Sequence, residues 1–212
     1  MEVIVITPPK EVEKEHEEIH RLFKAGLRML HIRKPDMTKA KLKEYIQKIP
    51  EKYHDRLVLH SHHRLAMNFK LKGVHLTEKH RKTEFRLAIR LFLLNVFKPG
   101  LEISATFHHL KSLEVAKPRY SYVIISPVFD SISKEGYPGA FSLPKLKDAV
   151  EGSPYAVFGL GGIDETKISF CKDIGFFGIA LHGYVWESGD PAAKYKKIRE
   201  ICNPKPPPLE EF

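Results

Sequence analysis

Eight short runs of apolar and often β-branched residues recur along the 212 residues of the chain. They are Val3–Ile6, Met29–Ile32, Leu57–His60, Gly73–Leu76, Glu102–Ala105, Tyr122–Ile125, Tyr155–Gly159 and Phe176–Leu181. Each run is brief and almost continuously apolar, which is typical of a strand buried on both faces. The sequence therefore predicts eight buried strands.

Helical patterns separate these runs. They cover Glu11–Ala25, Thr38–Lys48, His108–Lys117, Leu143–Val150, Asp164–Cys171 and the stretch from Pro191 to Ile201. Asp190 before Pro191 supplies an N-cap carboxylate and a proline at the first helical position. Alternating strands and helices imply parallel strands with right-handed crossovers. Eight such units predict an α/β fold, a (β/α)8 TIM barrel, with a doubly wound open sheet as the alternative.

Composition narrows the class of protein. Hydrophobic residues make up 42% of the chain and charged residues 29%, as in water-soluble globular proteins. The longest mainly apolar run, Leu91–Phe97, is far shorter than the roughly 20 residues of a membrane-spanning helix. The start of the chain lacks the features of a signal peptide, and two cysteines are too few for a disulfide framework. We therefore expect a cytoplasmic protein that has no membrane partner.

The formal charge of +9 is the excess of 35 Lys and Arg over 26 Asp and Glu, and the lysines are spread along the chain without a basic block. This pattern favours small phosphorylated substrates over nucleic acid as partners. The sequence leaves open whether the chain forms a homo-oligomer. Residues 1–202 are expected to form one barrel domain, and residues 203–212, which contain Pro204 and Pro206–Pro208, a loose proline-rich tail.

Polar residues or glycines follow every predicted strand. Because chemistry in such barrels takes place at the carboxyl ends of the strands, we expect these residues to surround one mouth. The residues expected there are Arg33, His60, Thr106, Lys134, Gly162 and His182.

Two glycine-bearing turns follow the seventh and eighth runs. They contain Gly161-Gly162 and His182-Gly183, and glycines let backbone N–H groups approach an anion closely. Loops after these two strands often hold phosphate in such barrels, so a phosphate site is predicted here. The long loop after the sixth run carries Ser131, Ser133 and Lys134, which suit an oxyanion such as diphosphate.

Histidines are frequent and raise the question of a metal. His60 and His62 alternate along an extended segment, so both are expected to face one side, with His63 and His75 nearby. No carboxylate accompanies them at a strand end, and the sequence has no HExxH pattern. Roles in hydrogen bonding or phosphate contact are therefore favoured over zinc. His54, His63 and His80 are expected at the surface.

The strand ends resemble one known family, the thiamine phosphate synthase superfamily, which includes the thiazole tautomerases. The segment His31-Ile32-Arg33-Lys34 resembles its Gln-Leu-Arg-Glu-Lys, and Gly73–Leu76 is similar to its Gly-Val-His-Leu. Ile103–His108 resembles its Ile-Gly-Val-Ser-x-His, and Ser126–Lys134 its Gly-Pro-Val-Phe-x-Thr-x-Thr-Lys. With Gly161-Gly162-Ile163, the resemblance spans about residues 3 to 198.

The resemblance implies a transferase of thiamine biosynthesis. Such an enzyme joins hydroxymethylpyrimidine diphosphate to thiazole phosphate and releases diphosphate. By resemblance, Arg33 and Lys134 would hold the diphosphate, Thr106 would lie near the pyrimidine, and Ser131 and Ser133 near the thiazole. Gly161, Gly162 and the turn Leu181, His182 and Gly183 would bind the thiazole phosphate. His60 is a further catalytic candidate, and His31, Ser61, His75 and His108 are further candidates for substrate contact.

The chain departs from the family at the magnesium ligands. The family's Asn-Asp pair falls on His60-Ser61, and its second magnesium aspartate falls on His80, with Glu78 as the nearby carboxylate. Magnesium prefers carboxylate oxygens, so any magnesium cofactor is expected to be held mainly by a diphosphate ligand.

Two alternatives therefore remain beside the synthase. One is a thiazole tautomerase-like isomerase, in which His60, His108 or His182 would transfer protons, because the tautomerases' histidine is Pro127 here. The other is a non-catalytic phosphate binder.

Overall fold

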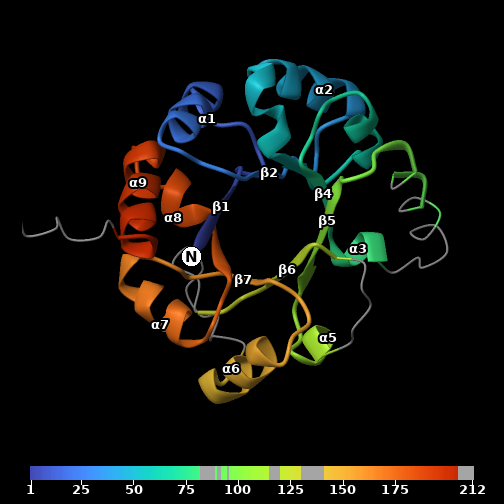
Figure 1. Cartoon of the computed structure of the whole chain (residues 1–212). Helices are drawn as coiled ribbons and strands as arrows, with labels where there is room; N and C mark the ends of the chain where they lie inside the picture. Colours follow the sequence, from blue (N-terminus) through green and yellow to red (C-terminus); the bar gives the residue numbers. More distant parts are fainter. Residues whose placement is uncertain (82–88, 90–91, 95, 115–119, 130–140, 205–212) are drawn as a thin grey trace, which may run out of the picture.

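Eight parallel strands form a closed barrel in a computed structural model of the chain (Figure 1). The structure describes residues 1–81, 89, 92–94, 96–114, 120–129 and 141–204. The strands are β1 (Glu2–Ile6), β2 (Leu30–Ile32), β3 (Leu57–Leu59), β4 (Gly73–Leu76), β5 (Glu102–Phe107), β6 (Tyr122–Ile125), β7 (Val157–Leu160) and β8 (Gly178–Leu181). The pairing of β8 with β1 closes the sheet, with Val3 opposite Ile179. The predicted TIM barrel is therefore confirmed, and the open sheet is wrong.

Helices surround the barrel as an outer ring (Figure 1). They are α1 (Glu15–Lys24), α2 (Lys39–Gln47), α3 (Glu78–Arg81), α5 (Lys111–Glu114), α6 (Leu143–Glu151), α7 (Ile168–Asp173), α8 (Gly183–Trp186) and α9 (Pro191–Cys202). The 3-10 helices are η1 (Glu51–Arg56), η2 (His63–Met67) and η3 (Glu165–Lys167). The described part of the chain contains no helix long and apolar enough to cross a membrane.

Side-chain caps fix several of the predicted helix starts. Thr38 Oγ1 accepts the backbone N–H of Lys41 at 3.3 Å, and Asp190 Oδ1 accepts that of Ala193 at 3.0 Å. The first helix starts later than predicted, at Glu15, because Lys14 adopts a left-handed conformation (φ 56°). The helix predicted over 108–117 starts at Lys111, and its last part lies outside the described residues.

The barrel interior combines an apolar part with a polar one. The apolar part is a buried cluster of Ile4, Ile6, Tyr122, Ile124, Phe158 and Ala180. His31, His75 and Ser104 are also buried, with at most 1% of each residue exposed. Buried polar groups are stable only when they are hydrogen-bonded, so these residues must form a network.

Candidate active site

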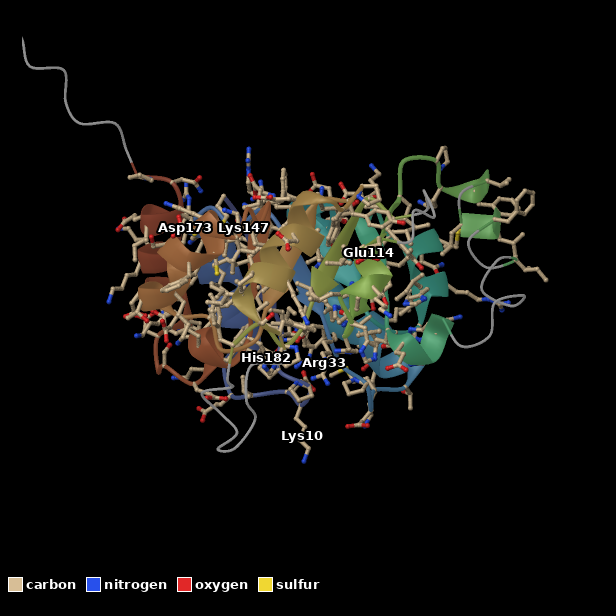
Figure 2. All side chains as sticks on the ribbon, turned by 90° about the horizontal axis from the view of Figure 1, so that it is seen from below. Lys10, Arg33, Glu114, Lys147, Asp173 and His182 are labelled. Carbon is tan, nitrogen blue, oxygen red and sulfur yellow. The ribbon has the colours of Figure 1, made fainter. Side chains whose placement is uncertain are left out.

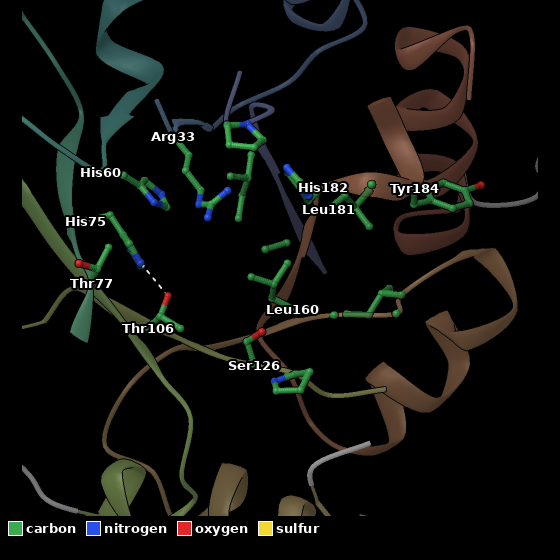
Figure 3. Close-up of a pocket in the computed structure, with 18 of the residues that line it drawn as sticks. Arg33, His60, His75, Thr77, Thr106, Ser126, Leu160, Leu181, His182 and Tyr184 are labelled. Carbon is green, nitrogen blue, oxygen red and sulfur yellow. Dashed lines mark hydrogen bonds between the residues drawn. The ribbon is translucent and has the colours of Figure 1, made fainter. Parts of the chain in front are cut away.

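A pocket of about 810 Å³ opens where the strands end (Figure 3). Figure 2 shows the two ends of the barrel in side view. Arg33 and His182 lie toward one end, and Glu114, Lys147 and Asp173 lie toward the other. The predicted site residues that line the pocket are Arg33, His60, His75, Thr106, His108, Gly161, Gly162, Leu181, His182 and Gly183, together with Glu78. The structure therefore gathers most of the predicted site around one mouth.

Some predicted residues lie elsewhere. His31 is fully buried, and neither it nor Ser61 or His80 is part of the pocket wall. Ser131, Ser133 and Lys134 lie outside the described residues.

The pocket residues that the sequence did not predict include Tyr184 and Glu187. Both follow Gly183 in or directly after the short helix α8. The signal that could have identified them is their position in the sequence, one to four residues after Gly183.

Glycine backbone forms the side of the pocket at the ends of β7 and β8. Gly161 and Gly162 have positive φ angles of 106° and 62°, a region that favours glycine. A Cβ atom on Gly161 would lie 3.0 Å from the Cα atom of Pro127, so the two segments pack with no room for a side chain. The same segment also holds the loop by a backbone hydrogen bond, in which Phe129 donates its N–H to the Gly161 carbonyl at 3.2 Å. This surface is suited to close approach by an anionic group.

Arg33 supplies a positive charge from the end of β2. Its backbone N–H donates to Thr7 Oγ1 at 2.9 Å, and its side chain lines the pocket (Figure 3). The neighbouring Lys34 points the other way, and its Nζ lies 2.7 Å from Glu15 Oε2 and 3.0 Å from the carbonyl oxygen of Lys10. Lys34 and Glu15 are both buried, and burial lowers the pKa of the lysine against the opposing effect of Glu15. Lys34 therefore fixes the segment that presents Arg33.

A buried histidine network lies on the side of the pocket formed by β2, β3 and β4, with His60 and His75 in the wall and His31 buried beside them. His31 Nδ1 lies 2.9 Å from His60 Nε2, and His31 Nε2 lies 2.7 Å from the Tyr122 hydroxyl. His75 hydrogen-bonds through Nδ1 to Ser104 Oγ at 2.8 Å. The rings of His60 and His75 stack with their centroids 4.3 Å apart.

The imidazoles of His31, His60 and His182 are neutral at ordinary pH. Burial lowers the pKa of His31 to about 3. Burial is also the main reason why the pKa of His60 lies well below its usual value, and nearby His75 adds to the effect. The pKa of His182 is lowered as well, by burial and then by the charge of Arg33. These three residues therefore offer imidazole nitrogens rather than positive charge.

Several histidine expectations were wrong. His62 has a left-handed backbone (φ 49°) and its Nε2 donates to the Met37 carbonyl, so it does not share a face with His60. His54 and His63 are buried rather than at the surface: their Nε2 atoms donate to the carbonyls of Ile49 at 2.9 Å and His75 at 3.1 Å. A buried imidazole is tolerated when a backbone carbonyl satisfies it, and sequence periodicity does not show such long-range partners.

The family's magnesium ion fits this donor set poorly. Ser61 offers one hydroxyl whose oxygen is buried and has no hydrogen-bond partner among the described residues. His80 uses Nδ1 to accept the backbone N–H of Thr77 at 3.3 Å. Glu78 lines the pocket, but no second carboxylate stands at the family's magnesium positions. Because magnesium prefers several oxygen ligands, the residues at these positions do not form a magnesium site of the family's kind.

The amino-acid sequence of the chain is similar to those of known proteins. The family model described as "Thiamine monophosphate synthase" matches residues 3–185, from β1 into α8. The thiamine-phosphate synthase of Cronobacter sakazakii is 26% identical over 191 residues, which is 88% of this chain and 88% of the relative. That of Limosilactobacillus fermentum is 28% identical over 160 residues, 76% of this chain and 72% of the relative.

A solved structure is also similar. The thiamine phosphate pyrophosphorylase from Bacteroides thetaiotaomicron superposes with a TM-score of 0.76 at 27% identity. The superposition covers 95% of this chain and 97% of that one.

Proposed function

Because the chain belongs to the thiamine monophosphate synthase family, a family of transferases, we propose that its pocket joins a hydroxymethylpyrimidine diphosphate to a thiazole phosphate. The observation that supports this proposal is that the pocket wall has two parts suited to anions. Glycine backbone at the ends of β7 and β8 forms one part, and the guanidinium of Arg33 at the end of β2 supplies the other. Two anionic groups on two substrates match these two parts.

The proposed reaction breaks one bond and forms another. The C–O bond between the pyrimidine methylene and the diphosphate breaks, and its electron pair leaves with the diphosphate. The lone pair of the thiazole nitrogen then attacks the methylene carbon and forms the new C–N bond. Preorganised positive charge at the leaving group and correct positioning of the two partners lower the barrier.

This chain's residues divide these tasks. Arg33 binds the departing diphosphate, and Gly161, Gly162 and Gly183 hold the thiazole phosphate through backbone N–H groups. Thr106 Oγ1, which lies 2.7 Å from His75 Nε2, orients the pyrimidine. Lys134 lies outside the described residues, and its contact with the diphosphate stays a prediction. Magnesium affinity of the protein alone is weak, and any ion enters mainly with the diphosphate.

One observation favours an isomerase as a second candidate. His182 lines the pocket, and its Nε2 atom is buried without a hydrogen-bond partner among the described residues. A neutral imidazole in this position suits proton abstraction from a bound heterocycle. An isomerase acting on a phosphorylated thiazole would use the same glycine backbone.

The experiment that separates these functions supplies the purified protein with both substrates. A synthase forms thiamine phosphate and diphosphate in equal amounts. A protein that exchanges thiazole protons without the pyrimidine substrate, and forms no thiamine phosphate, is the isomerase. A protein that binds thiazole phosphate more tightly than its unphosphorylated alcohol, yet does neither, is a binder. Equal affinity for the phosphate and the alcohol would rule out the phosphate site itself.

A further inference from the structure

Three imidazoles from three neighbouring strands converge beside the pocket, and two of them, His60 and His75, belong to its wall. His31 lies in β2, His60 directly after β3 and His75 in β4. All three residues are buried, and one nitrogen from each lies within 4.8 Å of the others. His60 and His75 also line the pocket, where Figure 3 shows their rings side by side.

The spacing of these nitrogens is close to that of a three-histidine metal site. Zinc–nitrogen distances of about 2.0–2.1 Å place two ligands of a tetrahedral ion roughly 3.3 Å apart. His31 Nδ1 and His60 Nε2 are 2.9 Å apart, slightly closer than this. Since the most distant pair is separated by 4.8 Å at most, ring movements of about 1 Å are enough to enclose an ion.

The outer nitrogens of two rings are already held by hydroxyl groups. Tyr122 engages His31 Nε2 at 2.7 Å, and Ser104 engages His75 Nδ1 at 2.8 Å. Histidines that bind metals almost always donate their other N–H to such a partner, which fixes the tautomer and the ring orientation. With these partners kept, the nitrogens that would bind an ion are Nδ1 of His31, which contacts His60, and Nε2 of His75, which contacts Thr106.

We propose that His31, His60 and His75 bind a divalent transition-metal ion such as Zn²⁺. Imidazole nitrogens suit zinc and its neighbours and are mismatched to magnesium. Binding moves Thr106 Oγ1 away from His75 Nε2 and requires a tautomer change in one ring of the His31–His60 contact. Because His60 and His75 line the pocket, the fourth coordination position is open on that side to water or to an oxygen of a bound ligand.

The proposal goes beyond the transferase function and does not depend on it. The competing explanation is that the three rings form only a hydrogen-bonded chain through Tyr122 and Ser104. The two explanations differ in one measurable property, the binding of a single ion with tetrahedral nitrogen coordination.

The test titrates the full chain, first stripped with a chelator, with Zn²⁺ and with Co²⁺ alone. One ion per chain and the intense visible absorption of tetrahedral Co²⁺ are expected, with no competition from millimolar Mg²⁺. His60→Gln should weaken binding on the order of 100-fold or more, because it removes one of three ligands. Tyr122→Phe keeps the ring but removes the partner of His31, and should weaken binding about 10- to 100-fold.

His108→Ala is the matched control, since His108 also lines the pocket and lies outside the three-histidine cluster. It should bind Zn²⁺ as the wild type does. Circular dichroism and thermal melting of each variant without metal verify that it is folded. Absence of one-to-one binding in the wild type would overturn the proposal. So would wild-type affinity in both His60→Gln and Tyr122→Phe, or equal loss in His108→Ala.

Discussion

Replacing Glu15 by glutamine tests the buried ion pair that supports Arg33. The side chains of Lys34 and Glu15 are 0% and 1% exposed, and their charged atoms lie 2.7 Å apart. Glu15 also accepts the Tyr45 hydroxyl at 2.5 Å and the backbone N–H of Val12 at 3.1 Å. Glutamine keeps the shape but removes the carboxylate that pairs directly with the buried Lys34 ammonium, which then keeps only the weaker Coulombic attraction of Glu11.

The size of the effect follows from this burial. Breaking a buried ion pair by removing one partner costs about 3–5 kcal/mol, because a charge remains unpaired in a site of low dielectric constant. Lys34 keeps the Lys10 carbonyl, and burial lowers the pKa of Lys34, so it can lose its proton instead. We therefore expect Glu15→Gln to lose an unfolding free energy at the lower end of this range, about 3 kcal/mol. For a chain of this length the melting temperature should fall by roughly 6–12 °C.

Urea denaturation of Glu15→Gln measures this loss of unfolding free energy. The control is Glu17→Gln, an exposed position on the same helix, which should change stability by less than about 0.5 kcal/mol. The double variant Glu15→Gln with Lys34→Met should recover part of the loss, because no charge is then left unpaired. A loss below about 1 kcal/mol in the single variant, or a double variant less stable than the single one, would refute the reasoning.

Three further predictions concern the pocket and its rim. Gly161→Ala forces a Cβ onto a φ of 106° and should cost about 1–3 kcal/mol of stability and weaken thiazole phosphate binding; unchanged urea and binding titrations would contradict this. The hydrogen bond from Lys197 is the main reason why the pKa of Glu165 falls from 4.5 to about 2. The ion pair therefore stabilises the folded state above the pKa of the unfolded chain, and this stabilisation is lost as the pH falls toward 2. Because the Lys197 side chain is 56% exposed and that of Glu165 26%, solvent screens the pair and its contribution is below about 1 kcal/mol. A pH series of unfolding that compares the wild type with Glu165→Gln should show the difference vanish in acid. Ser61→Asp combined with His80→Asp should raise diphosphate release at limiting magnesium more than either change alone; an active wild type unaffected by the double change would show that these positions do not bind the ion.

The strands and helix caps could be predicted because their causes are local. A buried parallel strand needs an apolar run, and a cap needs one side chain beside the first turn, as Thr38, Asp164 and Asp190 provide. The polar residues at strand ends could be placed at one mouth because a parallel barrel brings those ends together.

Partners distant in the sequence could not be predicted in this way. Lys34 followed a strand like Arg33, yet it is buried against Glu15, which precedes it by 19 residues. His31 and His60 contact each other across 29 residues, a pairing that became visible only once β2 and β3 were in register. The same applies to His54, which a backbone carbonyl holds in the interior.

The rate of diphosphate release in a single turnover, measured for Arg33→Ala with both substrates bound, tests the central claim most directly. Arg28→Ala is the matched control, because Arg28 precedes β2 at its other end and pairs with Glu2. The division of the pocket predicts a rate roughly 100- to 1000-fold slower for Arg33→Ala, as for removal of one preorganised charge-stabilising donor. Affinity for thiazole phosphate should remain unchanged. Release from Arg33→Ala at the rate of Arg28→Ala would contradict the account.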